Sequence, residues 1–277
     1  YEVDDIVETE VTPRNFGRIA AQNAKQVVVQ RIREAERGMV FEKFSSREND
    51  IVTGIIQRME NKNVYIDLGK AEAILTPNEQ IPGEIYQYHD RMKTYIVEVK
   101  KTSKGPQIMV SRTHPGLLKR LFELEVPEIH DGLVEIKSVA REPGMRSKIS
   151  VYTKDENIDP VGACVGHKGM RVQTIVNELR GEKIDIVKYS SEPDQYVANA
   201  LSPAKVVSTE VLEEEKICRV IVPDYQLSLA IGKEGQNARL AAKLTGWKID
   251  IKSESQAAEE AEQGAQEVGV AYEADED

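Results

Sequence analysis

The sequence is poor in the residues that build metal sites and disulfide frameworks. Its 277 residues include two cysteines, Cys164 and Cys218, and four histidines, none of which stands at a paired metal-ligand spacing. No Cys-x-x-Cys motif occurs, so structural zinc is not expected, and a lone cysteine in an apolar setting favours a buried free thiol. The sequence also lacks a signal-peptide core and any apolar run near the ~20 residues that span a bilayer. We therefore expect a soluble, cytoplasmic protein with no metal site and no membrane partner.

Basic residues are missing from both ends of the chain, which changes the meaning of its net charge of −10. Residues 1–10 contain five acidic residues and residues 253–277 contain nine, with no lysine or arginine in either segment. The remainder holds 37 basic against 33 acidic residues, a net charge of +4. The overall acidity therefore does not exclude nucleic-acid binding by the middle of the chain.

The N-terminal part favours a long connecting helix. Thr12 and Pro13 are typical of a helix start, and apolar residues follow at helical spacing as far as Ala35. Gly38 is typical of a helix end. We expect the acidic segment before this helix to be the end of a domain that has been cut away.

Residues 49–112 favour a small all-β domain. Five short runs of β-type residues are separated by turn residues, which predicts a five-stranded barrel of the OB type. In the second run Tyr65 alternates with apolar residues, so it is expected on the wet face of the barrel. There it is either a platform for stacking a nucleic-acid base or an ordinary surface tyrosine, and the sequence leaves the two equal.

The C-terminal half contains an internal repeat, 159–189 and 223–253. Each copy has a short apolar run, a Gly-x-x-Gly loop, an amphipathic helix ending at a glycine, and the tetrapeptide Lys-Ile-Asp-Ile. The first loop glycine precedes the lysine of that tetrapeptide by 17 residues in one copy and 16 in the other. A period near 66 residues indicates a duplicated domain rather than a solenoid.

The glycine loops do not have the spacing of a nucleotide-cofactor site. A P-loop needs a glycine at the position of Leu227 and a serine or threonine at the position of Glu234, and a dinucleotide fingerprint needs a glycine two residues before Gly166. Two Gly-x-x-Gly loops that each open a helix are typical instead of KH domains, which clamp a single strand. No cofactor is therefore expected. The candidate RNA-binding residues are Gly166, His167, Lys168, Gly169 and Arg171 in the first copy, Gly232, Lys233, Glu234, Gly235 and Arg239 in the second, and Tyr65.

A barrel followed by two repeated domains is an order that resembles the NusA family of bacterial transcription elongation factors. The resemblance rests on IGKEGQNARLAAKLTGWKIDI (231–251) and on Tyr-Ile-Asp-Leu-Gly (65–69), and it covers about residues 12–252. It implies an S1-type barrel followed by two bacterial-type (type II) KH domains of α+β structure. It also implies a non-catalytic factor that holds nascent single-stranded RNA and modulates pausing, termination and antitermination by RNA polymerase. The implied partners are RNA, RNA polymerase, mainly through an N-terminal domain of which only the last helix is present, and other Nus-type factors.

We therefore expect a multidomain, monomeric protein made of five segments. They are 1–43, the C-terminal end of a truncated N-terminal domain with its connecting helix; 44–113, an S1-type OB-fold barrel; 114–190, the first KH domain; 191–252, the second KH domain; and 253–277, an acidic disordered tail. Two other functions are possible for such a chain. One is an RNA-processing enzyme such as polynucleotide phosphorylase, which has the KH and S1 modules in the reverse order. The other is a protein scaffold with degenerate loops, which the acidic Glu234 suggests.

Overall fold

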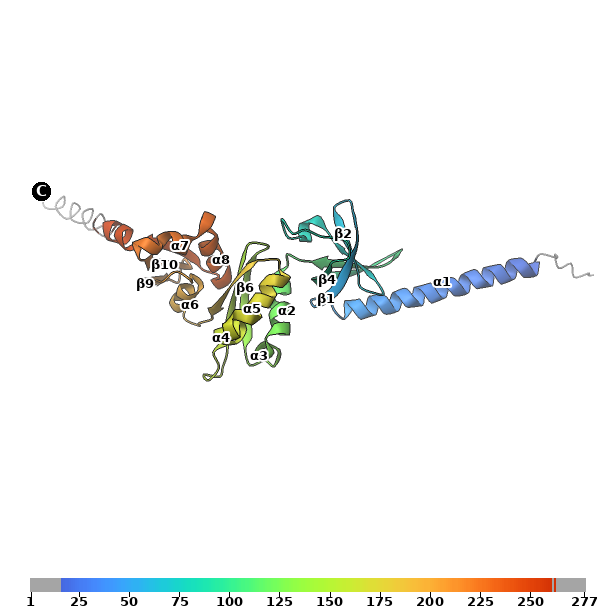
Figure 1. Ribbon diagram of the computed structural model, residues 1–277, viewed down its shortest axis with the longest axis horizontal. Helices are drawn as coiled ribbons and strands as arrows, with labels where there is room; N and C mark the ends of the chain where they lie inside the picture. The colour runs from blue at the N-terminus through green and yellow to red at the C-terminus, as the bar shows by residue number, and fades with distance from the viewer. Residues whose placement is uncertain (1–15, 261, 263–277) are drawn as a thin grey trace, which may run out of the picture.

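The computed structural model describes residues 16–260 and 262, which form a long helix followed by three small domains in a row (Figure 1). The predicted helix start at Thr12-Pro13 and most of the predicted acidic tail lie outside these residues. Helix α1 (Phe16–Ser45) extends away from the domains, and the last of the three domains lies at the opposite end of the molecule.

The first domain is a closed five-stranded barrel, as predicted. Its strands are β1 (Ile51–Glu60), β2 (Asn63–Asp67), β3 (Glu72–Leu75), β4 (Arg91–Thr102) and β5 (Gly105–Ser111), in the order β1-β2-β3-β5-β4, with a short 3₁₀ turn η1 (Pro77–Glu79) after β3. Val64 and Ile66 are fully buried, and Tyr65 between them points outward. The alternation in the sequence therefore gave the correct strand faces.

The predicted helix end at Gly38 was wrong, because α1 continues to Ser45. Glycine inside a helix costs about 1 kcal/mol relative to alanine. The extra turns place Phe44 in the barrel core, where it is 2% exposed, and Val40 and Phe41 against that core. Burial of a phenylalanine contributes roughly 1.5–3 kcal/mol, which outweighs the cost of the glycine.

The second and third domains share the order helix–strand–strand–helix–loop–helix–strand, as predicted for type II KH domains, and the first KH domain has one additional short helix, α3, before its first strand. The first contains α2 (Pro115–Glu125), α3 (Pro127–His130), β6 (Glu135–Glu142), β7 (Arg146–Tyr152), α4 (Pro160–Val165), η2 (His167–Gly169), α5 (Met170–Glu178) and β8 (Lys183–Lys188). The second contains α6 (Pro193–Ala200), β9 (Ser208–Leu212), β10 (Ile217–Val222), η3 (Asp224–Gln226), α7 (Leu227–Ile231), η4 (Lys233–Gly235), α8 (Gln236–Thr245) and β11 (Lys248–Ser253). In both, the Lys-Ile-Asp-Ile strand pairs parallel to the middle strand of the sheet.

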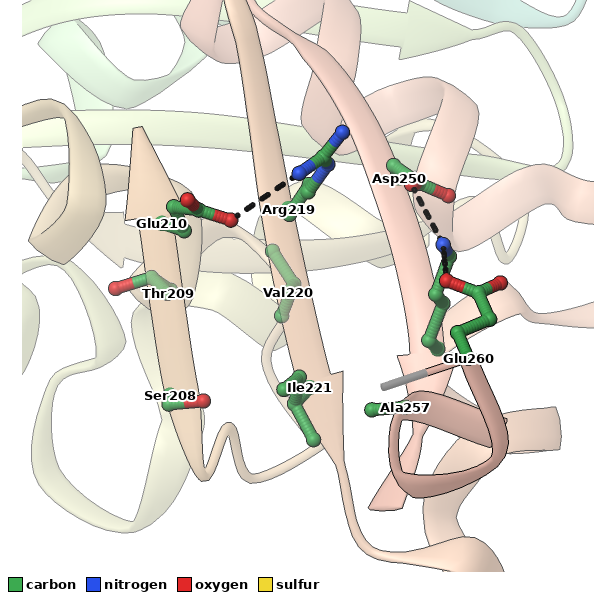
Figure 2. A pocket seen from close by; sticks show the side chains of 10 residues that line it. Ser208, Thr209, Glu210, Arg219, Val220, Ile221, Asp250, Ala257 and Glu260 are labelled. Carbon is green, nitrogen blue, oxygen red and sulfur yellow. Dashed lines mark hydrogen bonds and ion pairs between the residues drawn. The ribbon is translucent and has the colours of Figure 1, made fainter. Parts of the chain in front are cut away.

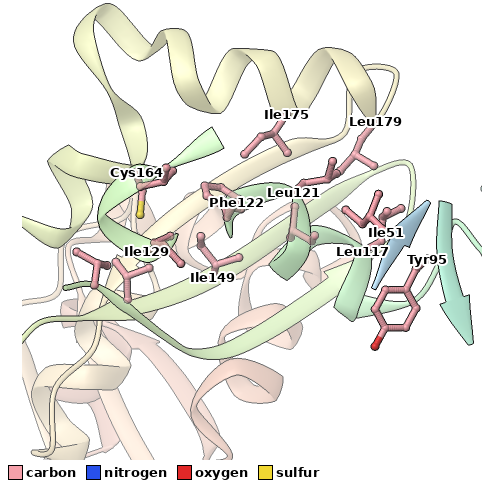
Figure 3. Packing of buried hydrophobic residues seen from close by; sticks show 14 residues of the cluster. Ile51, Tyr95, Leu117, Leu121, Phe122, Ile129, Ile149, Cys164, Ile175 and Leu179 are labelled. Atoms are coloured by element: carbon pink, nitrogen blue, oxygen red, sulfur yellow. The ribbon is translucent and has the colours of Figure 1, made fainter. Parts of the chain in front are cut away.

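The three domains share hydrophobic cores across their boundaries. Ile51 and Tyr95 of the barrel pack with Leu117 and Leu121 of the first KH domain (Figure 3). Gly116 is required at this boundary, because a Cβ there would lie 2.5 Å from the Tyr95 ring. On the other side of the first KH domain, its sheet packs against α6 and α8 of the second. These shared cores favour one continuous body over independently moving modules.

A buried arginine reinforces the boundary between the barrel and the first KH domain. The Arg112 side chain is 1% exposed and forms an ion pair with Glu84, which is 2% exposed. Arg112 also donates to the carbonyl of Lys93 at 2.8 Å and to the Glu178 carbonyl of α5 at 3.0 Å. One guanidinium therefore binds groups of both domains, using the planar fork of donors that distinguishes arginine from lysine.

The start of the predicted disordered tail is helical instead, since residues 254–260 continue as a helix directly after β11. Ser253 and Gln256 form a reciprocal capping box: the backbone N–H of Gln256 donates to the Ser253 hydroxyl, and the backbone N–H of Ser253 donates to the Gln256 side chain. The Ser255 hydroxyl donates to Asp224 at 2.6 Å and attaches this turn to the second KH domain. The acidic composition of the segment led to the prediction of disorder, although Ser253 and Gln256 stand at the spacing of a helix capping box.

Both cysteines are buried and free, as predicted, and burial raises the pKa of Cys164 to about 12. Within residues 16–260 and 262, none of the helices has the length and apolar character of a membrane span. The same part of the chain contains no cluster of His, Cys, Asp and Glu side chains placed to hold a metal ion.

Replacing Arg112 by methionine should destabilise the barrel–KH boundary strongly, because the buried Glu84 carboxylate would keep only the more distant Arg180, at 3.9 Å, as a counter-charge. Breaking such a pair from one side costs about 3–5 kcal/mol. Urea unfolding of the Arg112→Met variant measures the loss. A matched control is Arg219→Met, since the Arg219 side chain is 52% exposed and pairs with the exposed Glu210 at 3.4 Å, for which less than about 1 kcal/mol is expected. Equal losses in the two variants would show that Arg112 is not the critical contact.

Candidate nucleic-acid interface

The two Gly-x-x-Gly loops have the same backbone conformation. Gly166 and Gly232 have φ/ψ of 75°/176° and 78°/172°, and Gly169 and Gly235 have 75°/13° and 73°/13°. All four φ values are positive, a region that favours glycine. The duplicated sequence therefore builds the same turn twice, although the two inner residues of the loops differ.

The two loops carry their charged side chains at different positions. Lys168 and Glu234 occupy the same left-handed position, with φ of 52° and 54°, while His167 corresponds to Lys233. All four of these side chains are exposed. The first loop thus presents a lysine where the second presents a glutamate, and the cation of the second loop stands one position earlier.

The helices after the loops begin without a capping side chain, although the first N–H of each, at Met170 and Gln236, donates to a loop carbonyl. Gly169 and Gly235 are the N-terminal caps of α5 and α8, and neither helix receives a hydrogen bond from a capping side chain. Exposed N–H groups at a helix N-terminus and the partial positive charge of the helix dipole both favour an anion. The geometry of both loops is therefore suited to approach by a phosphate.

Arg171 supports the first loop through hydrogen bonds. Its guanidinium donates to the Ala163 carbonyl at 2.6 Å, at the end of α4, and to Glu128 at 2.8 Å. Asn237 occupies the corresponding position of the second copy, where its amide donates to the Ala230 carbonyl at 3.0 Å. In both copies the side chain at this position connects a carbonyl near the end of the preceding helix to the helix that follows the loop. The structure thus gives Arg171 a supporting contact beneath the loop that the sequence did not reveal.

Arg239 links the two KH domains. Its Nε donates to Glu142 of β6 at 2.6 Å, and Gln236 donates to the other oxygen of the same carboxylate at 2.9 Å. The hydrogen bond from Arg239, more than any other contact, holds the pKa of Glu142 below its usual range. Glu142 therefore remains charged at neutral pH and fixes the start of α8 to the sheet of the first KH domain.

A hollow of about 410 Å³ lies where the two KH domains meet, beside the second loop. Gly232 and Lys233 line it from one domain, and Arg146 and Lys183 line it from the other. Arg146 is paired with Asp185 at 2.7 Å, whereas Lys183 is exposed. Sequence reasoning missed Arg146 and Lys183, because only the packing of the domains brings them to the loop. The one feature of the sequence that could have indicated a role for Lys183 is its place as the first residue of the repeated tetrapeptide.

Tyr65 is half-buried on the outer face of the barrel, and one face of its ring is covered. The Arg58 guanidinium lies 4.1 Å from the ring centroid and donates to Glu72 at 2.9 Å. Tyr65 therefore presents a partly exposed ring beside a cation that is already held in place, which suits stacking of a base.

A second hollow, of about 440 Å³, lies over the sheet of the second KH domain (Figure 2). Its cations already have partners: Arg219 pairs with Glu210 at 3.4 Å, and Lys252 pairs with Asp250 at 3.6 Å and with Glu260. Because its charges are neutralised internally, this hollow is a poorer site for a phosphate backbone than the loops.

Four family descriptions match successive parts of the chain. They are the NusA N-terminal domain at residues 1–38, the S1 RNA binding domain at 45–111, the NusA-like first KH domain at 112–189 and the NusA-like second KH domain at 193–259.

Three relatives carry the description "Transcription termination/antitermination protein NusA". The relative from Halalkalibacterium halodurans is 72% identical, and the alignment covers 94% of this chain and 68% of the relative. The relative from Bacillus subtilis is 71% identical, with 94% and 70% covered. The relative from Mycobacterium bovis is 51% identical, with 90% and 75% covered.

Replacing the second glycine of a loop should separate RNA binding from folding. A Cβ on Gly235 would meet no atom within 4 Å, so Gly235→Ala should fold, at the roughly 1–2 kcal/mol that a left-handed alanine costs. That methyl group would occupy the surface that a sugar-phosphate backbone approaches, so RNA affinity should fall. Fluorescence anisotropy with labelled single-stranded RNA measures the affinity, and urea unfolding measures the stability.

A matched control is Gly246→Ala, since Gly246 has the same conformation, φ 76° and ψ 13°, at the far end of α8. This variant should lose similar stability and keep its RNA affinity. Gly232→Ala should be far more destabilising, because its Cβ would lie 2.7 Å from the Asn237 backbone nitrogen. Unchanged RNA binding by Gly235→Ala would show that the RNA does not approach this glycine.

Proposed function

Because this chain belongs to the NusA family of transcription termination/antitermination proteins, we propose that it holds nascent single-stranded RNA and thereby modulates RNA polymerase. The observation that carries the proposal is the repeated loop geometry: two Gly-x-x-Gly turns with matching dihedral angles, each opening a helix that lacks a side-chain cap. Such a loop clamps about four nucleotides of a single strand.

In this proposal each residue has a definite role. Gly166, Gly169, Gly232 and Gly235 let the RNA backbone approach, and Lys168, Lys233 and the neighbouring Lys183 supply counter-charge to its phosphates. Arg171 and Arg239 act indirectly, by holding the loops and the domain boundary in place. Tyr65 offers one ring face to a base on the barrel.

The proposal includes no catalytic step and no cofactor. RNA polymerase is the proposed protein partner, reached mainly through the N-terminal domain, of which residues 1–38 match the family description. Effects on pausing, termination and antitermination would follow from holding the RNA close to the enzyme that makes it. A cytoplasmic location fits this role, and other Nus-type factors are proposed as further partners.

Reversing the charge of the two loop lysines should weaken RNA binding without unfolding the protein, because both side chains are exposed. The Lys168→Asp/Lys233→Asp variant should bind labelled single-stranded RNA less tightly. Its affinity should also depend less on salt, since each lost phosphate contact to a single strand removes about 0.7 from the slope of log K against log salt. Anisotropy titrations at two salt concentrations measure both effects.

The control is Lys154→Asp/Lys216→Asp, which makes the same change of charge at exposed lysines away from the loops. It should bind RNA nearly as well as the unmodified chain. A loop variant no weaker than this control would rule out the loops as phosphate clamps. If the unmodified chain binds no RNA even at low salt, the alternative of a protein scaffold with degenerate loops is favoured.

Glu234→Gln tests the acidic position directly. Removing a negative charge beside the second loop should tighten RNA binding, and the gain should shrink as salt is raised. The same titration measures it. An unchanged affinity would mean that the Glu234 carboxylate does not face the RNA.

A further inference from the structure

A basic cleft lies between α1 and the barrel, away from both KH loops. It has a volume of about 300 Å³, and α1 forms one wall while the β2–β3 and β4–β5 loops form the other. A neighbouring hollow of about 430 Å³ shares Glu36, Val40 and Lys70 with it, so the two are continuous along the helix. We call them together the helix–barrel cleft.

The helix–barrel cleft gathers positive charge that the rest of the described chain does not neutralise. Five cations line it: Arg33, Arg37, Lys43, Lys70 and Lys104. Glu36 is the one acidic residue among the lining residues. Within residues 16–260 and 262, no carboxylate oxygen lies within 4.0 Å of any of these five cations. The hollow of Figure 2 differs, because its cations are paired.

This concentration of charge opposes folding unless an anion relieves it. Arg33 and Arg37 are four residues apart on one face of α1, and like charges at this spacing destabilise a helix. The chain as a whole has a net charge of −10, so the cluster is not a consequence of a generally basic composition. A negatively charged ligand would remove the repulsion and benefit from all five cations.

Arg37 is held in place within the cleft. Its guanidinium donates to the Ser103 carbonyl at 3.3 Å. Its side chain lies over Gly105, where an added Cβ would sit 3.5 Å from Nε. The barrel loop therefore orients the arginine, which lowers the entropy that a bound phosphate would have to remove.

The lining chemistry indicates recognition of a backbone rather than of bases. The floor is formed by Val40, Ala71 and Pro106, and none of the lining residues is aromatic. Bases of a single strand stack best on aromatic side chains, which the cleft lacks, whereas phosphates require distributed cations, which it has. The cleft also belongs to the barrel, since Lys70 lies in the loop that follows β2, the strand that contains Tyr65.

We propose that the helix–barrel cleft binds the phosphodiester backbone of RNA without sequence preference and extends the RNA path past the barrel. This inference rests on the proposed RNA-binding function and adds a site to it. An acidic protein segment would satisfy the same charges, but RNA is favoured because the barrel wall of the cleft belongs to the RNA-binding unit.

The test compares two lengths of labelled single-stranded RNA in anisotropy titrations of the whole chain. The short RNA has about eight nucleotides, enough for two KH loops, and the long RNA adds the ~16 nucleotides that an OB fold can cover. The unmodified chain should bind the long RNA more tightly. Lys70→Glu/Lys104→Glu should weaken binding of the long RNA about ten- to thirtyfold at 0.1 M salt and lower its salt slope by about 1.4. Binding of the short RNA should not change.

Two controls make the test decisive. Lys154→Glu/Lys216→Glu changes the total charge equally at exposed positions outside the cleft and should leave the affinity difference between the two RNAs intact. Lys70→Arg/Lys104→Arg keeps the charge and should bind both RNAs normally. An equal affinity of the unmodified chain for both RNAs, or an equal loss for both in the cleft variant, would overturn the proposal.

Other outcomes separate this proposal from the proposed function. If the short RNA fails to bind the unmodified chain, the KH function itself is wrong. If the short RNA binds but lengthening it adds nothing, only the cleft proposal fails. A poly-glutamate peptide that binds the unmodified chain but not the cleft variant, with RNA binding unaffected in both, would assign the cleft to an acidic protein partner instead.

Discussion

The arrangement of the domains depends on the burial of one positive charge. Arg112 lies where the barrel ends and the first KH domain begins, and its guanidinium is shielded from water with Glu84 as counter-ion. An ion pair in such a place is costly unless all its donors are used, and Arg112 uses them on groups of both domains. The bond from Arg112 to the Glu178 carbonyl therefore holds the first KH domain in one position on the barrel. The proposed continuous RNA-binding surface depends on that position.

The first KH domain acts as the central support of the molecule. One face of its sheet packs on its own helices, and the other packs on α6 and α8 of its neighbour. Buried Lys148 continues the contact, since its ammonium group pairs with Asp185 and donates to the Ser202 carbonyl of the second domain. Desolvation by burial lowers the pKa of this lysine, while Asp185 opposes the change. Within residues 16–260 and 262, no further domain packs on the corresponding sheet face of the second KH domain, which carries the hollow of Figure 2 instead. The repeat in sequence is therefore not a repeat in surroundings.

Local signals in the sequence were sufficient for the fold and for the loops. Two glycines three residues apart before an amphipathic helix specify a turn through the backbone alone, and alternation in the second run of β-type residues gave the strand faces. Contacts between distant residues could not be predicted in the same way. Arg239 resembles a phosphate ligand in the sequence, but its partner Glu142 lies 97 residues away. Gly38 looked like a helix end because the barrel core that receives Phe44 is formed by residues not adjacent in sequence.

The charge difference at the left-handed position of the two loops makes the two proposed clamps unequal. A phosphate at the first loop would meet the Lys168 ammonium group, whereas a phosphate at the second loop would meet the Glu234 carboxylate at the same backbone position. Two copies of one backbone turn thereby become a stronger and a weaker anion site. A bound strand would be expected to dissociate first at the second loop.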